Sequence, residues 1–224
     1  MPPSSTATAP VVYVLALDDS LPESLLGHVH GHLLDRLKQK AELKKAETTA
    51  HALDLLNEPA TPQAILVTDT GVLKKKNNQV SQKLFDYARD GGIVVLGCVF
   101  SSTARPSDLR NFFRKWDLPW EKSEYLRTIV ALNSTANGVP STGLPAWYSQ
   151  KAVFLAPVDP EAVWYRPTGT SVRDSAVFGA DSVSTSHTAV AYTKVGNGSL
   201  GYIGDVNGED ETTDVVLGMM RLLL

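Results

Sequence analysis

Apolar runs and helical periodicities alternate through the first half of the chain. Val11–Leu17 is a continuous apolar run that stops at two aspartates, which is typical of a strand buried on both faces. From Pro22 to Lys40, apolar residues recur at steps of three and four positions and predict an amphipathic helix. The alternation continues with an edge strand at Glu42–Thr48, a helix at Thr49–Leu56, a strand at Ala64–Asp69, a helix at Gln79–Asp90 and a strand at Ile93–Gly97. This order predicts βαβ units and a parallel sheet.

The second half of the chain is richer in extended segments. A helix is expected after Pro106, and a last helix from about Glu211 to Leu223 is expected to lie against the sheet. Between them the predicted strands are Thr128–Leu132, Ala152–Leu155, Ala162–Tyr165, Ala189–Val195 and Ser199–Ile203. Gly196–Gly198 predicts a tight hairpin turn between the last two strands. The sequence therefore predicts an α/β fold with a mostly parallel sheet and a strand-rich C-terminal half.

Length and composition indicate one globular domain. With 224 residues, 43% of them hydrophobic, the chain can bury a full core over residues 11–224, and residues 1–10 are expected to form a flexible tail. The net charge of −3 gives no electrostatic footprint for nucleic acid or a membrane, so neither partner is expected. The apolar runs are shorter than the roughly 20 residues that cross a bilayer. A single cysteine allows no internal disulfide, which fits the reducing cytoplasm or the nucleus.

Three stretches of the chain resemble the class I glutamine amidotransferase-like superfamily, and within it most closely the trehalose-utilisation (ThuA-like) proteins. They are Ala64–Gly71, the segment Gly91–Gly97 with the helix before it, and Gly196–Gly204 before the final helix. The resemblance spans Val11 to Leu224 and concerns architecture more than activity. It implies a flavodoxin-like three-layer sandwich whose functional residue lies on a sharp turn after the strand that ends at Gly97.

In catalytic relatives this turn is a nucleophile elbow, where a cysteine is flanked by small residues two positions away on each side. Here the small residues Gly97 and Ser101 flank Val99, and Cys98 has large apolar residues at the flanking positions. The catalytic pair of the family, a His and a Glu two residues apart after the last strand, is absent from residues 205–211. We therefore expect an inert Val99 at the nucleophile position and no glutaminase chemistry.

Cys98 has two interpretations. Free cysteine is among the most buried residue types, so Cys98 is first of all a small apolar residue at the end of a strand. The alternative is a thiolate activated by a helix N-terminus and a histidine such as His187, which would support a hydrolase or a glyoxalase-like activity.

The carboxyl ends of parallel strands gather functional side chains at one edge of a sheet. Asp18, Asp19 and Ser20 follow the first strand there. The predicted ligand-binding residues are Asp19, Asp69, Thr70, Cys98, Val99, Ser101, Ser102, Asp205, Asn207 and Glu209. Acids and hydroxyls in one cleft suit a sugar, another polyol or a hard divalent cation. The same residue types after strands also cap helices, so a structural role for each stays open.

Other features carry weaker signals. His28 and His32 share a helix face but His30 does not, and no further ligand lies at a suitable spacing, so neither a metal nor a cofactor is predicted. Lys74–Lys76 are interpreted as solvated surface. Aromatic side chains such as Trp147 suit the core, a sugar or a protein partner.

The leading hypothesis is an intracellular amidotransferase-like domain without glutaminase chemistry, a pseudoenzyme that binds or regulates through a small polar ligand or sugar, with a protein partner or a second copy as further partners. The alternative is an enzyme that acts on a carbohydrate or another small polar substrate through carboxylates, with Asp69 and Glu209 as candidates. It predicts two acids with displaced pKa values, about 5 to 9.5 Å apart if a glycosidic bond is cut. A Cys98-dependent hydrolase is the third hypothesis.

Overall fold

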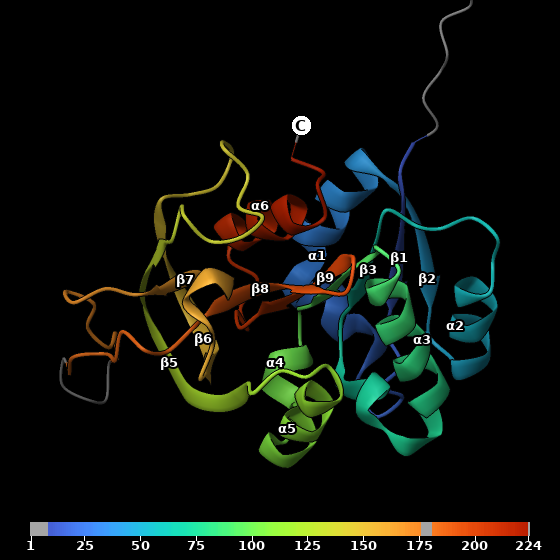
Figure 1. The fold of residues 1–224 in the computed structure, drawn as a ribbon, viewed down its shortest axis with the longest axis horizontal. Coiled ribbons are helices and arrows are strands. Elements are labelled where there is room, and N and C mark those ends of the chain that lie inside the picture. The colour runs from blue at the N-terminus through green and yellow to red at the C-terminus, as the bar shows by residue number, and fades with distance from the viewer. Residues whose placement is uncertain (1–8, 176–180, 224) are drawn as a thin grey trace, which may run out of the picture.

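A nine-stranded sheet forms the centre of the computed structural model, which describes residues 9–175 and 181–223 (Figure 1). The strand order is β2-β1-β3-β4-β9-β8-β7-β5-β6. The strands are β1 (Val11–Leu15), β2 (Glu42–Ala46), β3 (Ala64–Val67), β4 (Ile93–Leu96), β5 (Glu121–Leu132), β6 (Trp147–Ala156), β7 (Val163–Pro167), β8 (Val190–Val195) and β9 (Gly198–Ile203).

The sheet is parallel in its first half and antiparallel in its second. β1 pairs in parallel with β2 and β3, β3 pairs with β4, and β4 pairs with β9. The pairs β9–β8, β8–β7, β7–β5 and β5–β6 are antiparallel. This mixed α/β architecture confirms the expected parallel sheet and strand-rich C-terminal half.

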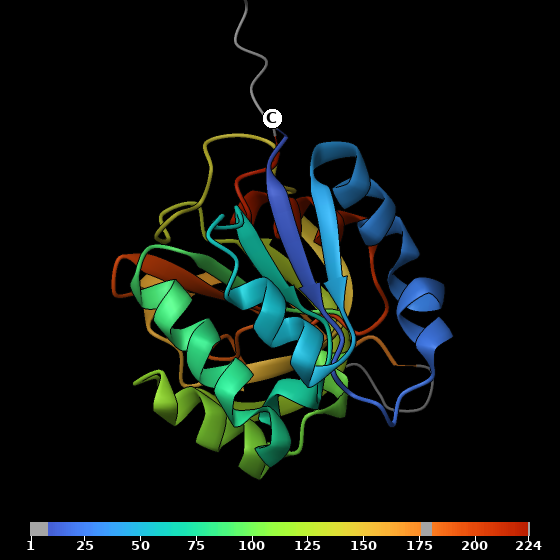
Figure 2. The same ribbon diagram turned by 90° about the vertical axis from the view of Figure 1, so that its right-hand side faces the viewer.

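Helices cover both faces of the sheet. They are α1 (Glu23–Lys40), α2 (Thr49–Leu56), α3 (Asn78–Arg89), α4 (Phe100–Thr103), α5 (Pro106–Lys115) and α6 (Asp210–Met219), with 3-10 turns η1 (Thr70–Leu73), η2 (Lys75–Asn77) and η3 (Pro160–Ala162). Figures 1 and 2 show α1 and α6 on one face, and α2, α3 and α5 on the other. Successive strand residues alternate between two buried clusters: Val12 and Val14 lie under α1, whereas Tyr13 and Leu15 lie on the opposite side.

Most predicted elements agree with the observed ones to within a few residues. The exceptions are β5 and β6, which begin at Glu121 and Trp147, several residues before the predicted starts. The added residues of each strand are held in β conformation by hydrogen bonds to the other strand. No local sequence pattern reveals this pairing. The predicted hairpin between β8 and β9 is confirmed, and Gly196 takes a left-handed φ of +59° at its turn.

The predicted solvated face of α1 needs one correction. His30 is buried, and its backbone departs from helical geometry (φ −117°, ψ 21°). The His30 side chain therefore lies inside the protein instead of in the solvent. Within the described residues, no helix is both long enough and apolar enough to cross a bilayer.

Candidate functional site

The turn between β4 and α4 has the strained geometry of a nucleophile elbow, and its strained residue is Cys98. Cys98 has φ +55°, a left-handed value that L-residues rarely adopt, whereas Val99 has φ −83°. The turn is closed by the Phe100 N–H, which donates to the Gly97 carbonyl at 3.1 Å. Cys98, and not the expected Val99, therefore occupies the strained position of this turn.

The large side chains beside Cys98 were expected to crowd the turn, but they point elsewhere. Leu96 and Phe100 are both fully buried in the cluster under α3 and α5. Cys98 belongs to the opposite cluster, under α1 and α6. The two large neighbours thus pack away from the turn and do not crowd it.

The thiol of Cys98 is enclosed. Its residue is 3% exposed, and burial raises the pKa of the thiol far above its ordinary value, with further contributions from the charges of Asp205 and Asp69. His187, the histidine suggested as an activating base, lies instead beside Glu124, with 3.5 Å between its Nδ1 and the Glu124 Oε2, and near the ring of Phe154. The protonated, enclosed thiol matches the first interpretation of Cys98.

Asp69 ties the carboxyl ends of β1 and β3 together. Its Oδ1 accepts hydrogen bonds from the N–H of Leu17 at 3.1 Å and from the N–H of Gly71 at 2.8 Å. Burial raises the pKa of Asp69, hydrogen bonds from the backbone of Gly71, Asp18 and Leu17 oppose that shift, and the nearby charge of Asp18 adds to it. The carboxylate of Asp69 is therefore occupied by hydrogen bonds from the surrounding backbone.

Asp205 organises the loop between β9 and α6. Its Oδ1 accepts from the N–H of Asn207 at 2.9 Å, and its Oδ2 accepts from the N–H of Glu209 at 2.8 Å. The hydroxyl of Ser101, after the elbow, donates to the Gly204 carbonyl at 3.1 Å. The ends of β4 and β9 are therefore neighbours, as expected, but their polar atoms bind one another.

Three further predicted residues, Glu209, Ser102 and Asp19, also have protein partners. Glu209 forms an ion pair with Arg127 at 2.6 Å, and the Ser102 hydroxyl donates to the Val99 carbonyl at 3.0 Å. Asp19 pairs with Lys76 at 2.7 Å and with Lys74 at 2.9 Å. The hydrogen bonds from Lys76 and Lys74 lower the pKa of Asp19 to about 2.

A small polar cavity of about 240 Å³ opens at this edge of the sheet. It is lined by Asp18, Thr70, Leu73, Lys74, Thr103, Arg105 and Asp108. The hydroxyl oxygens of Thr70 and Thr103 are 3.3 Å apart, and Thr70 also donates to Asp18 at 3.1 Å. Thr70 is the one predicted ligand residue in its lining, and Asp18 was noted only for its place after the first strand. The other residues were missed, although Thr103 and Arg105 follow the elbow closely in sequence.

Asp18 is held ionised in this cavity. Its partial burial favours the protonated form, but hydrogen bonds from Lys74, Ser20 and Thr70 outweigh it and lower its pKa to about 2. Asp18 and Asp69 therefore have pKa values displaced in opposite directions. The lining of the cavity thus carries two acids, Asp18 and Asp108, the two cations Lys74 and Arg105, and two hydroxyls.

The three histidines of α1 have different surroundings. His28 is exposed, and His32 lies 3.1 Å from Asp210, measured from Nδ1 to Oδ1. Burial lowers the pKa of His30 to about 4, and its Nε2 has no hydrogen-bond partner. Over the described ranges, no group of three or more His, Cys, Asp or Glu side chains is arranged to hold a metal ion.

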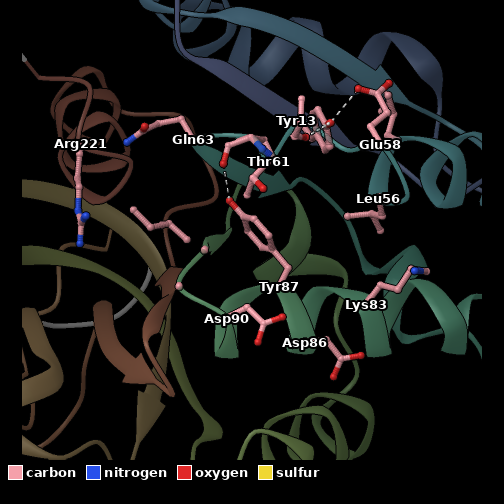
Figure 3. A pocket seen from close by; sticks show the side chains of 16 residues that line it. Tyr13, Leu56, Glu58, Thr61, Gln63, Lys83, Asp86, Tyr87, Asp90 and Arg221 are labelled. Carbon is pink, nitrogen blue, oxygen red and sulfur yellow. Dashed lines mark hydrogen bonds between the residues drawn. The ribbon is translucent and has the colours of Figure 1, made fainter.

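A larger cavity, of about 550 Å³, lies at the amino ends of β3 and β4, opposite the elbow (Figure 3). Tyr13 donates to Glu58 at 3.1 Å, and Tyr87 donates to the Pro62 carbonyl at 3.0 Å. The lining around these tyrosines also carries charges of both signs. The cations are Lys83 and Arg221, and the acids are Asp86 and Asp90. No local sequence pattern indicates this cavity, because its walls come from distant segments.

Comparison with known proteins identifies the fold. No protein-family model matches the sequence, and no curated protein matches it. A protein from Bacteroides uniformis described as ThuA-like matches the structure with a TM-score of 0.61 at 10% identity, over 100% of this chain and 95% of the other. A protein from Parabacteroides merdae with the same description has a TM-score of 0.59 at 9% identity, over 97% and 90%.

A third similar structure, from Thermoplasma acidophilum, is described as part of a GMP synthase. Its TM-score is 0.54 at 11% identity, over 97% of this chain and 95% of the other. Identities this low show the fold alone. The resemblance noted in the sequence is confirmed at that level: this chain has the fold of the two proteins described as ThuA-like.

Proposed function

We propose that the chain is an amidotransferase-like domain, of the flavodoxin-like three-layer kind, that binds a small polar ligand and has no glutaminase activity. The observation that best supports the absence of glutaminase activity is that the Cys98 thiol is buried. The elbow keeps its left-handed backbone, but the thiol is enclosed and its pKa is raised. A cysteine nucleophile must be exposed and readily deprotonated, so this elbow acts as a structural turn.

The ligand site in this proposal is the 240 Å³ cavity at the carboxyl edge of the sheet. Its volume is below the range of about 300 to 1,000 Å³ that is usual for drug-sized ligands. Hydroxyls from Thr70 and Thr103 and the ionised Asp18 offer several hydrogen bonds over a short distance. That chemistry suits one sugar ring or a similar polyol.

Two measurements test this proposal. Ammonia release from glutamine should stay at background, and Cys98 should react with a disulfide reagent only after the protein is unfolded. A thermal-shift panel of monosaccharides and polyols should contain a compound that raises the Tm, because a ligand that binds only the folded state stabilises it.

A matched pair of variants links the Tm shift to this cavity. The double variant Thr70→Val with Thr103→Val should abolish it, and Thr193→Val on β8 should retain it. Glutamine turnover, or a thiol that reacts rapidly in the folded protein, would refute the proposal.

A second candidate function is an enzyme that uses carboxylates on a carbohydrate. The opposite pKa displacements of Asp18 and Asp69 support it, because an acid and a base at one site need different pKa values. The burial of Asp69 and its two backbone bonds favour the first proposal. Hydrolysis of nitrophenyl glycosides by the wild type, lost in Asp18→Asn, would favour the enzyme.

We also propose that residues 11–224 form a single domain. We further propose that the protein acts in the cytoplasm. The support for this location is the reduced state expected for the lone Cys98.

A further inference from the structure

A long groove runs between α3 and α5, on the outer side of the helices that cover one face of the sheet. Figures 1 and 2 show these two helices side by side. One part of the groove, of about 610 Å³, lies over η1, η2 and the start of α5. A second part, of about 470 Å³, continues along α3 and shares Asn78, Ser81 and Lys115 with the first. We call the two parts together the α3–α5 groove.

The charge of the α3–α5 groove is opposite to that of the whole chain. Its lining carries Lys74, Lys75, Arg105 and Lys115, and its one acid is Asp108, whereas the chain has a net charge of −3. Asp108 is paired with Arg105 at 2.6 Å. The groove is therefore a local basic surface on an acidic protein.

Two of these cations are available to a partner. Lys74 is engaged by Asp18 at 2.6 Å and by Asp19 at 2.9 Å. Lys75 and Lys115 are exposed, and among the ion pairs of the described residues none involves either of them. Both side chains line the groove. Lys75 comes from η2, and Lys115 comes from the end of α5.

The floor of the groove is apolar and aromatic. Val72, Leu73 and Phe112 line the first part, and Phe85 and Trp116 line the second. The rings of Phe85 and Trp116 meet edge to face, with centroids 5.3 Å apart. An apolar floor between basic rims fits a chain that carries both acidic and apolar side chains.

We propose that the α3–α5 groove binds an acidic peptide segment of a partner protein. An acidic side chain would pair with Lys75 and another with Lys115, while an apolar side chain would lie over Phe85, Phe112 and Trp116. The groove, with parts of about 610 and 470 Å³, is larger than a single small anion needs, and its cations are too few for the phosphate stripe of a nucleic-acid surface. This inference goes beyond the proposed function, because Lys75 and Lys115 do not line the small cavity.

The test uses a short fluorescein-labelled peptide in which glutamate alternates with phenylalanine. Its fluorescence anisotropy should rise on titration with the full-length protein, and added salt should weaken the binding. The same peptide with glutamine in place of glutamate should bind at least about tenfold more weakly, since the charge pairs supply part of the affinity. Hydrogen exchange should slow in α3 and α5 when the acidic peptide is bound.

The variant Lys75→Glu with Lys115→Glu should weaken binding of the acidic peptide by at least about tenfold. Both side chains are exposed, so the variant should keep the wild-type Tm. Lys38→Glu with Lys194→Glu changes the net charge equally at distant sites and should bind like the wild type. The polyol-induced Tm shift should be unchanged in both variants, which separates this inference from the proposed function.

Three results would overturn the inference. One is equal weakening in both double variants, which would indicate nonspecific charge attraction. Another is the absence of any anisotropy change with the acidic peptide. The last is an oligouridylate that binds more tightly than the peptide and loses affinity in Lys75→Glu with Lys115→Glu, which would assign the groove to RNA.

Discussion

The carboxylate of Asp69 accepts the backbone N–H of Leu17 at 3.1 Å and so joins the ends of two strands that are distant in sequence. Its second acceptor bond, from Gly71 at 2.8 Å, holds the start of η1. Both donors are buried backbone groups, which are costly to leave without a partner. Asp69 therefore keeps the carboxyl edge of the sheet assembled, including the turn that carries Thr70.

Asp69→Ala should destabilise the protein by about 2 to 4 kcal/mol, because it leaves two buried N–H groups unpaired. Asp69→Asn retains one acceptor oxygen and should cost less than Asp69→Ala. Urea unfolding followed by circular dichroism measures both. Asp86→Ala, at an exposed position of α3, is the matched control and should cost little. Equal stability of Asp69→Ala and the wild type would contradict this role.

Gly71 has no room for a side chain. A Cβ there would lie 2.2 Å from the carbonyl carbon of Leu17, which is rigid backbone. Gly71→Ala should therefore destabilise the fold by about 3 kcal/mol or more, since the strands must shift. Gly27→Ala on α1 is the opposite case, because nothing lies within 4 Å of its Cβ position.

Gly27→Ala should raise the free energy of unfolding by about 0.5 to 1 kcal/mol through helix propensity. Thermal and urea unfolding of the two variants should therefore move in opposite directions. A Gly71→Ala protein as stable as the wild type would show that the η1 turn is loosely held.

His30 should make stability depend on pH. Burial lowers its pKa from 6.5 to about 4 in the folded protein, so between these values the unfolded chain binds the proton more strongly. Stability should fall as the pH drops below 6.5 and level off near pH 4, by about 3 kcal/mol at most.

His30→Leu removes this titration and should flatten the stability profile in that window. The carboxylates Asp18 and Asp19, with pKa values of about 2, lose their stabilising charge only at lower pH. Urea unfolding at several pH values, for wild type and variant, measures the difference. Parallel profiles would indicate that His30 is hydrated in solution.

Two substitutions at Cys98 should reveal the backbone strain of the elbow. Cys98→Ala and Cys98→Gly both remove the thiol, but only glycine adopts φ +55° without steric cost. Cys98→Gly should therefore be about 1 kcal/mol more stable than Cys98→Ala. The reverse order, measured by urea unfolding, would show that packing of the Cβ outweighs the backbone strain.

The sequence anticipated the local elements because their signals are local. The apolar run at Val11–Leu17, the periodicity of α3 and the turn at Gly196 each appear within one short window and match the structure. The start of β5 was misplaced because its first residues are extended by pairing with β6, which lies beyond a long intervening segment.

The candidate site was anticipated less well. Residue types at strand ends pointed to the correct edge of the sheet, where Ser101 and Gly204 are in contact. They did not show that Asp69, Asp205 and Glu209 are already bound by backbone groups or by Arg127. Whether a polar side chain serves a ligand or its own fold depends on partners that are distant in sequence.

By itself, the sequence determined the alternation of strands and helices, the α/β class and the resemblance to ThuA-like proteins, because hydrophobic periodicity and turn residues act over a few positions. Tertiary structure alone decided that Cys98 takes the strained position and that its thiol is enclosed. It also decided that His30 is buried and that two helices enclose a basic groove. Burial and charge environment are sums over neighbours from the whole chain, and only the folded arrangement supplies them.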